Sequence, residues 1–162
     1  MMRGVLARDL GGYQQRWHTD LDDLAAAYLN GRGRSLFVAR LDGRLVGTAG
    51  VKPCRVGAPP NPEWLVRRYR DPSVCELVRV WVSGGARRHG VARRLVETAV
   101  RWATTEGGYR TVYLHTDVTA PGAEPFWRAL PTVEVHDART EPFHCVHFEV
   151  DAPKLLAEAG RR

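Results

Sequence analysis

The sequence predicts a mixed α/β domain, in which helices flank a largely antiparallel central sheet of about six or seven strands. An Asp42-Gly43 pair between two β-branched runs indicates a hairpin. A nearly continuous apolar run over 75–83 is followed by an amphipathic helical pattern, which is typical of a crossover from a buried strand. Two further short apolar runs follow near the end of the chain. We expect the 162 residues, 1–162, to form one domain around a single core.

The first third of the chain contains a strand that we predict ahead of residue 19, then a helix and the hairpin. The helix is expected over 19–30, from a Thr19 or Asp20 cap to a stop at "NGRG". Its apolar stripe consists of Leu21, Leu24, Tyr28 and Leu29. The alternation that follows predicts antiparallel strands over 35–41 and 44–51.

The middle of the chain combines an irregular segment with a strand and a long helix. Residues 52–73 contain five prolines and no clear period, so we expect a long loop with a short helix near Trp64. A buried strand over 75–83 leads into a helix that ends at the "EGGY" of 106–109. The apolar face of this helix is expected to contain Val91, Leu95, Ala99 and Trp102. Its solvated face is expected to contain Arg93, Arg94, Glu97, Thr98 and Arg101.

The last third of the chain continues the alternation of strands and helices. A strand is expected over 111–118 and a short helix over 121–130. The runs "TVEVHD" and "FHCVHFEVD" predict a second hairpin, and "PKLLAEAG" predicts a tail helix. This order of elements is typical of a mixed sheet with crossover helices.

The composition is that of a globular protein with an excess of positive charge. The formal net charge is +6, and the three cysteines lack CxxC spacing. The charge favours an anionic partner, and scattered cysteines are expected to be free thiols in a reducing compartment. No apolar stretch reaches the ~18 residues of a membrane span. Because the first residues also lack a secretory pattern, we expect a cytoplasmic location without membrane contact.

A basic cluster, "ARRHGVARRL" at 86–95, separates the buried strand from the long helix. It fits a nucleic-acid patch, a solvated helix face or a phosphate cradle. A nucleic-acid surface would spread its arginines over several elements with stacking aromatic residues, so no nucleic acid is expected as partner. The first N–H groups of a helix lack intrahelical partners and carry partial positive charge, which suits a diphosphate. Gly90 permits close approach to a phosphate, and Arg87, Arg88 and Arg93 add charge-assisted bonds.

The segment Arg87-Arg88-His89-Gly90-Val91-Ala92 resembles the Arg/Gln-x-x-Gly-x-Gly/Ala signature of the GNAT superfamily of N-acetyltransferases. The signature begins five residues after Val82, at the end of a buried strand, as that family requires. The likeness extends over most of the chain, since the early helix, the hairpin and the later strands and helices fall in family order. The resemblance implies a GNAT-type sheet whose central strands, near 76–82 and 111–118, are splayed apart. It also implies acetyl-CoA as cosubstrate.

Carried over by position, the resemblance implies which residues hold acetyl-CoA. The backbone of Val80, Trp81 and Val82 would bond the pantetheine arm and the acetyl carbonyl, where backbone donors stabilise an oxyanion. The pyrophosphate would bind the loop and first helical turn formed by Arg87, Arg88, His89, Gly90, Val91, Ala92 and Arg93. The resemblance further implies direct transfer of acetyl to a primary amine of a small molecule or peptide.

Acetyl transfer to an amine requires a base for the nitrogen and donors for the oxyanion, and an acid assists the leaving thiolate. Glu76 stands six residues before Val82, where some family members keep a glutamate base, and burial is expected to raise its pKa. A structural ion pair with a neighbour such as Arg79 is the alternative for Glu76. His115 and Asp117 are the alternative bases, and alternation places both on one face of their strand, opposite Thr116.

The candidate acid is where the sequence departs from the family pattern. Trp127 stands where many members keep a tyrosine, and its indole can only form a wall of the thiol pocket. Ala120 and Pro131 replace an asparagine and a glycine that are common in this region. Either Tyr113 or a water acts as the acid, or the thiolate leaves unassisted. These departures keep open an alternative function, a non-catalytic domain of the same fold that binds or senses acetyl-CoA.

The acceptor amine is not identified by the sequence. In a GNAT-type fold, the irregular segments 52–73 and 136–144 would flank the site. Acidic candidates for contact with a cationic amine are Glu63, Asp71 and Glu141. No metal is expected, because alternation separates His144 from His147 on opposite strand faces. The exposed edges of the terminal hairpin are compatible with a homodimer.

Overall fold

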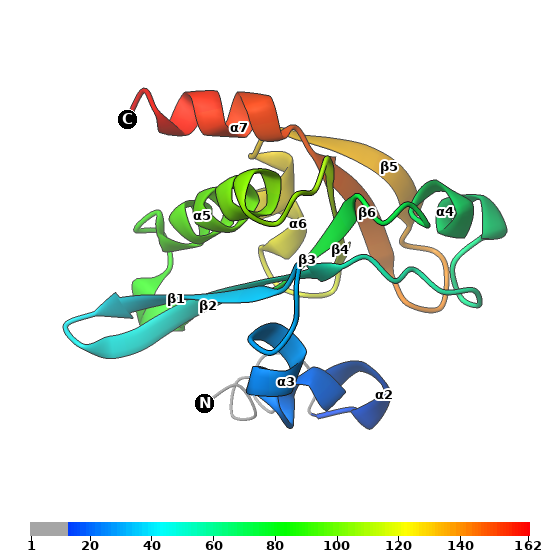
Figure 1. The fold of residues 1–162 in the computed structure, drawn as a ribbon, viewed down its shortest axis with the longest axis horizontal. Coiled ribbons are helices and arrows are strands. Elements are labelled where there is room, and N and C mark those ends of the chain that lie inside the picture. The colour runs from blue at the N-terminus through cyan, green and yellow to red at the C-terminus, as the bar shows by residue number, and fades with distance from the viewer. Residues whose placement is uncertain (1–12) are drawn as a thin grey trace.

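An open six-stranded sheet forms the centre of the structure, a computed structural model that describes residues 13–162 (Figure 1). Its strands, in the spatial order β1-β2-β3-β4-β6-β5, are β1 (Ser35–Leu41), β2 (Arg44–Pro53), β3 (Val74–Val82), β4 (Thr111–Asp117), β6 (Cys145–Val150) and β5 (Thr132–Ala138). Only the β3–β4 pair is parallel. The predicted mixed, largely antiparallel sheet is therefore confirmed. The strand predicted ahead of residue 19 falls mainly outside the described residues.

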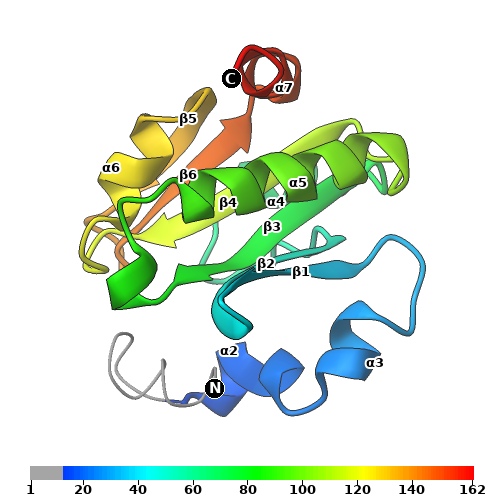
Figure 2. The same cartoon turned by 90° about the vertical axis from the view of Figure 1, so that its left-hand side faces the viewer.

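Helices cover both faces of the sheet (Figures 1 and 2). One face is covered by α5 (Val91–Thr105), α6 (Ala123–Arg128) and α7 (Ala152–Ala159). The opposite face is covered by α2 (Gln15–His18), the 3-10 turn η1 (Thr19–Leu21), α3 (Leu24–Tyr28) and α4 (Glu63–Arg68). We refer to this second face, which η1, α3 and α4 cover, as the acceptor face. Among the described residues, no helix is both long and apolar enough to cross a bilayer.

The main core lies between the sheet and α5, α6 and α7. Alternation along the strands places Leu114 of β4 and Phe148 of β6 on this face, beside Val96 and Val100 of α5. A smaller cluster on the acceptor face joins α4 to the sheet and contains Leu65, Tyr69, Val74 and Tyr113. The short helix that we predicted near Trp64 is therefore confirmed as α4, and its apolar side anchors the 52–73 segment.

The predicted hairpin forms between β1 and β2. Asp42 and Gly43 both have positive φ, 49° and 75°, which a two-residue loop of this handedness requires. Asparagine, aspartate and glycine tolerate this conformation best, so the turn residues determine the register of the two strands.

The single helix predicted over 19–30 is wrong. The chain forms η1 and α3 instead, because the Asp23 side chain accepts a bond from the backbone N–H three residues later at 2.9 Å and starts a new helix. Tyr28 is fully buried, whereas Leu24 and Leu29 are 37% and 65% exposed. The helix α3 therefore packs on the sheet through the ring of Tyr28, which lies beside Gly50 of β2, and not through the predicted stripe of four apolar residues.

The prediction that Glu97 is solvated is also wrong. Glu97 is only 9% exposed, and it accepts a bond from Arg93 Nε at 3.0 Å. Arg93 also contacts Glu158 of α7 at 2.6 Å, and Arg162 contacts Glu97. The periodicity of α5 alone predicts that this side of the helix faces solvent. Because α7 packs there, Glu97 forms ion pairs with Arg93 and Arg162 instead of contacting water.

Candidate functional site

The two central strands separate soon after they meet. β3 and β4 pair only over Val74–Glu76 with Thr111–Tyr113, and no further pair between them exists in residues 13–162. β3 continues to Val82 bonded only to β2, and β4 continues to Asp117 bonded only to β6. The expected splay of the central strands is therefore confirmed, and it leaves one edge of β3 open along 77–82.

A β-bulge in β3 lies at this open edge. The register with β2 shifts between Thr48 and Gly50, and Arg79 has a positive φ of 54°. The guanidinium of Arg79 binds both carboxylate oxygens of Asp20, at 2.6 and 2.8 Å, and Tyr28 also donates to Asp20. Thr48 Oγ1 donates to the Arg79 carbonyl at 2.8 Å. These contacts hold an otherwise unfavourable backbone conformation in place.

Electrostatics support the same ion pair. Burial alone would raise the pKa of Asp20, but its hydrogen bonds with Arg79 and Tyr28 bring the pKa below its ordinary value. Asp20 is therefore ionised at neutral pH. The bulge is thereby tied to η1, so the position of Val80 depends on a residue 60 positions earlier in the chain. Val80 is half-buried, and Trp81 and Val82 pair with Thr48 and Gly47 of β2.

The basic loop connects β3 to α5 through a 3-10 turn, η2 (Gly84–Ala86). Arg87 Nε donates to the Val82 carbonyl at 3.0 Å, which folds its side chain onto the end of β3. His89 Nδ1 lies 2.8 Å from the Arg87 carbonyl. Arg88 and Gly90 have positive φ values of 67° and 74°. Left-handed residues that alternate with other backbone conformations in this way form concave turns, in which successive N–H groups can converge on an anion.

The N-terminus of α5 is not capped by a side chain. Gly90 is the N-cap residue and forms no side-chain cap bond. By helix geometry, the N–H groups of Val91, Ala92 and Arg93 have no intrahelical acceptor. Arg88 is exposed, whereas the guanidinium of Arg93 is held by Glu97 and Glu158. The loop and turn thus bring together the seven residues predicted for the pyrophosphate, although one of the three arginines is directed to α7.

Glu76 and His115 are in contact where β3 and β4 begin to separate, since Glu76 is the last paired residue of β3 and His115 lies two residues beyond the last paired residue of β4. Glu76 is 7% exposed, and its Oε1 lies 3.1 Å from His115 Nδ1. Lys52 Nζ lies 3.7 Å from the other carboxylate oxygen. His115 is half-exposed on the acceptor face. The suggested alternative, a Glu76–Arg79 ion pair, does not form, because Arg79 binds Asp20 instead.

The expectation that the pKa of Glu76 is raised is wrong. Burial acts in that direction, but the hydrogen bond with His115 and the positive charges of Lys52 and Arg79 lower the pKa below the usual glutamate value. Glu76 is therefore a carboxylate at neutral pH. Its short contact to Nδ1 favours the His115 tautomer with a proton on Nδ1, which leaves Nε2 free to accept a proton.

A row of histidines continues from His115 across β6 and β5. The ring of His147 lies 5.9 Å from that of His115 and 5.5 Å from that of His136. Burial, with the charges of His115 and His136, lowers the pKa of His147 to about 4. His147 Nδ1 lies 2.7 Å from the Tyr113 hydroxyl. No cluster of three or more His, Cys, Asp or Glu within 13–162 is arranged to hold a metal.

The two residues considered for the acid region are both buried. Burial raises the pKa of Tyr113, whose side chain is 1% exposed, so Tyr113 is a weaker acid than free tyrosine. Trp127 is 6% exposed in the main core and packs edge-on against Phe126 at 4.9 Å. Neither position therefore presents an acidic proton to the splayed edge.

The cysteines are free thiols, as expected. Burial raises the pKa of Cys54 and Cys75 to about 12 and that of Cys145 to about 11. Thiols with such pKa values stay protonated at neutral pH and are poor nucleophiles.

The segments 52–73 and 136–144 meet on the acceptor face. The ring of Trp64 packs edge-on against that of His136, with 5.3 Å between the ring centroids. The ring centroids of Tyr69 and Tyr113 are 4.3 Å apart. The three acidic residues predicted to attract an amine already have partners within the protein. Glu63 pairs with Arg67 at 3.6 Å and Asp71 pairs with Arg110 at 3.9 Å, and a carboxylate oxygen of Glu141 lies 3.1 Å from Nε2 of His136. Their attraction for a cationic amine is correspondingly weakened.

Sequence reasoning missed Lys52 and the partnership of Asp20 with Arg79. Lys52 lies one residue beyond the predicted strand 44–51 and opposite Glu76 in the β2–β3 register, which the sequence alone does not reveal. Asp20 was considered only as a helix cap. No local pattern connects it to Arg79, because the two residues are 59 positions apart and belong to different layers.

Comparisons with known proteins agree with this geometry. The family model described as "Acetyltransferase (GNAT) family" matches residues 4–130. N-acetyltransferase 8 of Rattus norvegicus is 35% identical over 106 residues, which cover 65% of this chain and 42% of the rat protein. The chain thus spans less than half the length of that relative.

Solved structures share the fold at low sequence identity. An acetyltransferase of the GNAT family from Staphylococcus aureus Mu50 has a TM-score of 0.69 at 16% identity. The match covers 92% of this chain and 87% of the Staphylococcus aureus chain. An acetyltransferase from Bacillus anthracis, solved in complex with acetyl coenzyme A, has a TM-score of 0.57 at 18% identity. The match covers 77% of this chain and 66% of the Bacillus anthracis chain.

Proposed function

This chain belongs to the GNAT acetyltransferase family, and on that premise we propose that it transfers the acetyl group of acetyl-CoA directly to a primary amine. The observation that carries the proposal is the open edge of β3, which leads through the basic loop into an uncapped α5. The acceptor is a small molecule or a peptide. Acetyl-CoA supplies a thioester whose C–S bond breaks as the C–N bond forms, which releases the thiol of coenzyme A.

The residues present fit acetyl-CoA on three counts. The open edge of β3 offers unpaired backbone groups near Val80 to an extended amide-containing arm. The first turn of α5 offers backbone N–H donors and partial positive charge to a diphosphate. Arg88 is exposed beside that turn and adds a charge-assisted bond. Arg93 contributes through its backbone N–H, since its side chain is held by α7.

His115 is the proposed base, and Glu76 is its orienting partner. Glu76 accepts the Nδ1 proton at 3.1 Å, so the lone pair of Nε2 receives the proton that the attacking amine loses. The lowered pKa of Glu76 suits this role better than direct proton abstraction, because a weakly basic carboxylate holds few protons at neutral pH. Backbone N–H groups at the bulge near Val80 stabilise the developing oxyanion.

The leaving thiolate takes its proton from water in this proposal. Tyr113 is buried and its raised pKa opposes proton release, and Trp127 lies in the core. This same arrangement favours the second candidate function, a domain that binds acetyl-CoA without turnover. The two functions differ in one measurable event, the release of free thiol in the presence of an amine.

The test is a thiol-release assay with acetyl-CoA against polyamines, aminoglycosides, amino acids and amino-terminal peptides, together with calorimetric titration of acetyl-CoA. Turnover of any acceptor supports the enzyme. Binding of acetyl-CoA without thiol release from any acceptor supports the binding domain. No heat with acetyl-CoA contradicts both.

Two arginine substitutions, one in the basic loop and one further along α5, test the location of the cofactor site. We expect Arg88→Gln to weaken acetyl-CoA binding about tenfold, because it removes one charge-assisted bond to phosphate. The matched control is Arg101→Gln, which removes the same charge from an exposed position further along α5. Equal affinity of the two variants would contradict the proposed pyrophosphate site.

A further inference from the structure

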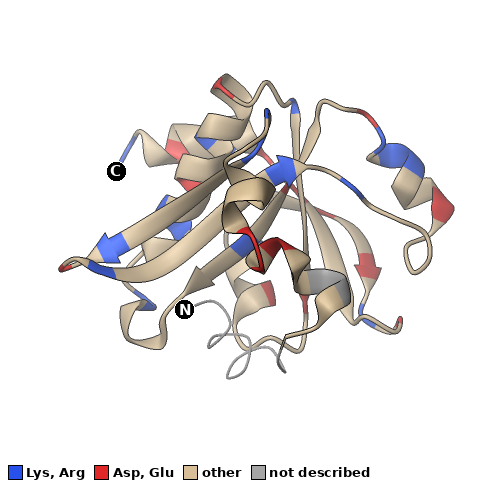
Figure 3. Cartoon of the chain, turned by 60° about the horizontal axis from the view of Figure 1, so that its bottom comes forward, with Lys and Arg blue, Asp and Glu red and all other residues tan. Residues whose placement is uncertain are grey.

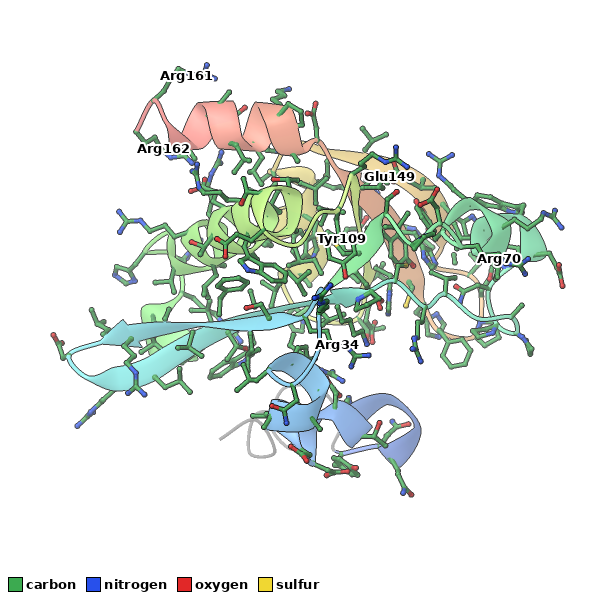
Figure 4. All side chains as sticks on the ribbon, in the orientation of Figure 1. Arg34, Arg70, Tyr109, Glu149, Arg161 and Arg162 are labelled. Atoms are coloured by element: carbon green, nitrogen blue, oxygen red, sulfur yellow. The ribbon has the colours of Figure 1, made fainter. Side chains whose placement is uncertain are left out.

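A pocket of about 430 Å³ lies on the acceptor face, between α3 and the end of β2. It carries three cationic side chains, Arg34, Lys52 and Arg55, and two carboxylates, Asp20 and Asp23. Arg34 lies between α3 and the sheet (Figure 4). From below the sheet, acidic positions are seen on the short N-terminal helices and basic positions on the strands behind them (Figure 3).

The two carboxylates of the pocket are already satisfied by the protein. Asp20 accepts two bonds from Arg79 and one from Tyr28. Asp23 accepts the backbone N–H of Ala26 at 2.9 Å and caps α3. The charge of Asp20 is therefore neutralised within the fold by Arg79, whereas Asp23, whose partner is a neutral N–H, keeps its negative charge.

The cations of the pocket are much less satisfied. Arg34 donates to the Ala27 carbonyl at 3.3 Å, a neutral acceptor. Lys52 approaches Glu76 at 3.7 Å, but that carboxylate also binds His115. Arg55 is exposed and has no ion pair with any residue from 13 to 162. The pocket thus presents an excess of positive charge.

The pocket also adjoins the proposed catalytic residues. Lys52 lines it and contacts Glu76, which orients His115. Asp20 lines it and holds Arg79 at the bulge. A molecule whose amine faces His115 therefore lies close to Lys52, one of the three cations of the pocket.

We propose that the acceptor carries, besides its primary amine, an anionic group, carboxylate or phosphate, that binds among Arg34, Lys52 and Arg55. This inference rests on the proposed acetyl transfer and specifies its substrate class. Guanidinium groups bind carboxylate and phosphate through paired, charge-assisted hydrogen bonds, so both anions suit the pocket. A polyamine would place a second cation among these three, which repels it.

The test compares acceptors that differ only at the far end. 6-Aminohexanoate, its carboxamide and 1,6-diaminohexane present similar primary amines followed by a negative, neutral or positive group. Homologues with fewer methylenes adjust the spacing, and ω-aminoalkylphosphonates replace the carboxylate. We expect kcat/KM for thiol release to be highest for the anionic acceptors, by about tenfold over the carboxamide. The ratio of phosphonate to carboxylate then identifies which anion the pocket prefers.

Variants of the pocket connect the preference to these residues. Arg55→Gln and Arg34→Gln are each expected to lower the preference for anionic over neutral acceptors several-fold, with little change for the carboxamide. Arg67→Gln is the matched control, since Arg67 is an exposed arginine of α4 outside the pocket. The guanidinium of Arg34 donates to the carbonyl of Ala27 in α3, so Arg34→Gln can destabilise the protein. Arg55→Gln then still tests the inference, because Arg55 forms no such contact with a helix within residues 13–162.

The outcomes separate this inference from the proposed function. Equal or faster turnover of the carboxamide or the diamine overturns the anionic acceptor and leaves acetyl transfer standing. A loss of turnover in Arg55→Gln that is equal for neutral and anionic acceptors also overturns it. Absence of thiol release with every amine overturns the proposed function and this inference together.

Discussion

The cofactor side and the acceptor side of the proposed site are built in different ways. The basic loop and the first turn of α5 form one continuous segment, 83–93, whose donors are mainly backbone N–H groups. The acceptor side is assembled from η1, β2, β3 and β4, and it relies on side-chain pairs such as Asp20–Arg79 and Glu76–His115. A local backbone site follows from local sequence, whereas an assembled site depends on register and packing.

This difference predicts how mutations act. Changes in the cofactor segment alter binding of one ligand, but changes on the acceptor side alter chemistry or the assembly itself. Four expected effects, taken from the largest to the smallest, separate these consequences.

The largest effect is expected for His115→Ala. Loss of a general base typically lowers kcat by about 10²- to 10⁴-fold, and we expect about 10³-fold here. Acetyl-CoA affinity by calorimetry is expected to stay unchanged, because the cofactor segment is separate. Added imidazole is expected to restore part of the rate. A loss of acetyl-CoA binding, or a rate within threefold of the original, would show that His115 is not the base.

Glu76→Gln refines the same prediction. The amide cannot stabilise a protonated imidazole as the carboxylate does, so kcat falls less than in His115→Ala but still measurably. Since Glu76 only orients the base, the pH profile of kcat is expected to shift, with KM for acetyl-CoA unchanged. A profile identical to that of the original protein would remove Glu76 from the mechanism.

The second effect concerns the assembly of the acceptor side. Asp20→Asn removes the negative charge that faces the guanidinium of Arg79, whose side chain is only 18% exposed, and loss of such a charge from a largely buried pair typically costs about 3 kcal/mol of folding free energy. Asp137→Asn is the control, because it breaks the pair with Arg139 at the surface, where such pairs are worth about 0–1 kcal/mol. Chemical denaturation measures both. Equal losses would show that the bulge does not need Asp20.

Much of the fold could be predicted because it is encoded locally. The Asp42-Gly43 turn, the run of β3 and the periodicity of α5 each lie within a short window. The cofactor segment belongs to the same class, since Gly90 at a strand-to-helix turn is visible in the sequence. The wrong predictions, the 19–30 helix, the solvated Glu97 and the raised pKa of Glu76, all failed where a residue from a distant element covers or contacts the side chain in question.

The acceptor side could be predicted only in part for the same reason. Glu76 and His115 were candidates because each has a reactive side chain on a predicted strand. Their contact needed the parallel pairing of β3 with β4, in which Glu76 lies opposite Tyr113. Lys52 needed the β2–β3 register, and a bulge at Arg79 shifts that register. A single sequence contains no direct signal for either pairing.

The third effect is a pH dependence of stability caused by His147. Burial lowers its pKa to about 4 from an ordinary value of 6.5, so the unfolded state binds its proton first as the pH falls. Stability is therefore expected to fall by about 2 kcal/mol between pH 6.5 and 4. The lowered pKa of Glu76 adds a further loss that begins as the pH falls through the ordinary glutamate pKa, because the carboxylate of the unfolded chain then takes up a proton before that of the folded protein.

His147→Gln isolates the histidine contribution. Glutamine retains an acceptor for the Tyr113 hydroxyl but does not titrate, so the slope of unfolding free energy between pH 6.5 and 4 is expected to flatten. Denaturant unfolding at several pH values measures this slope. An unchanged slope would show that His147 gains its proton equally in the folded and unfolded states.

The smallest effect is expected for Leu29→Ser, which tests the correction of the 19–30 helix. Leu29 is 65% exposed, so its substitution is expected to change the free energy of unfolding by less than about 0.5 kcal/mol. Tyr28→Phe, one residue earlier, removes a hydroxyl bonded to the half-buried Asp20 and is expected to cost about 1 kcal/mol or more. If the two adjacent substitutions cost the same, the acceptor side would be stabilised by a continuous apolar stripe rather than by the Tyr28–Asp20–Arg79 contacts.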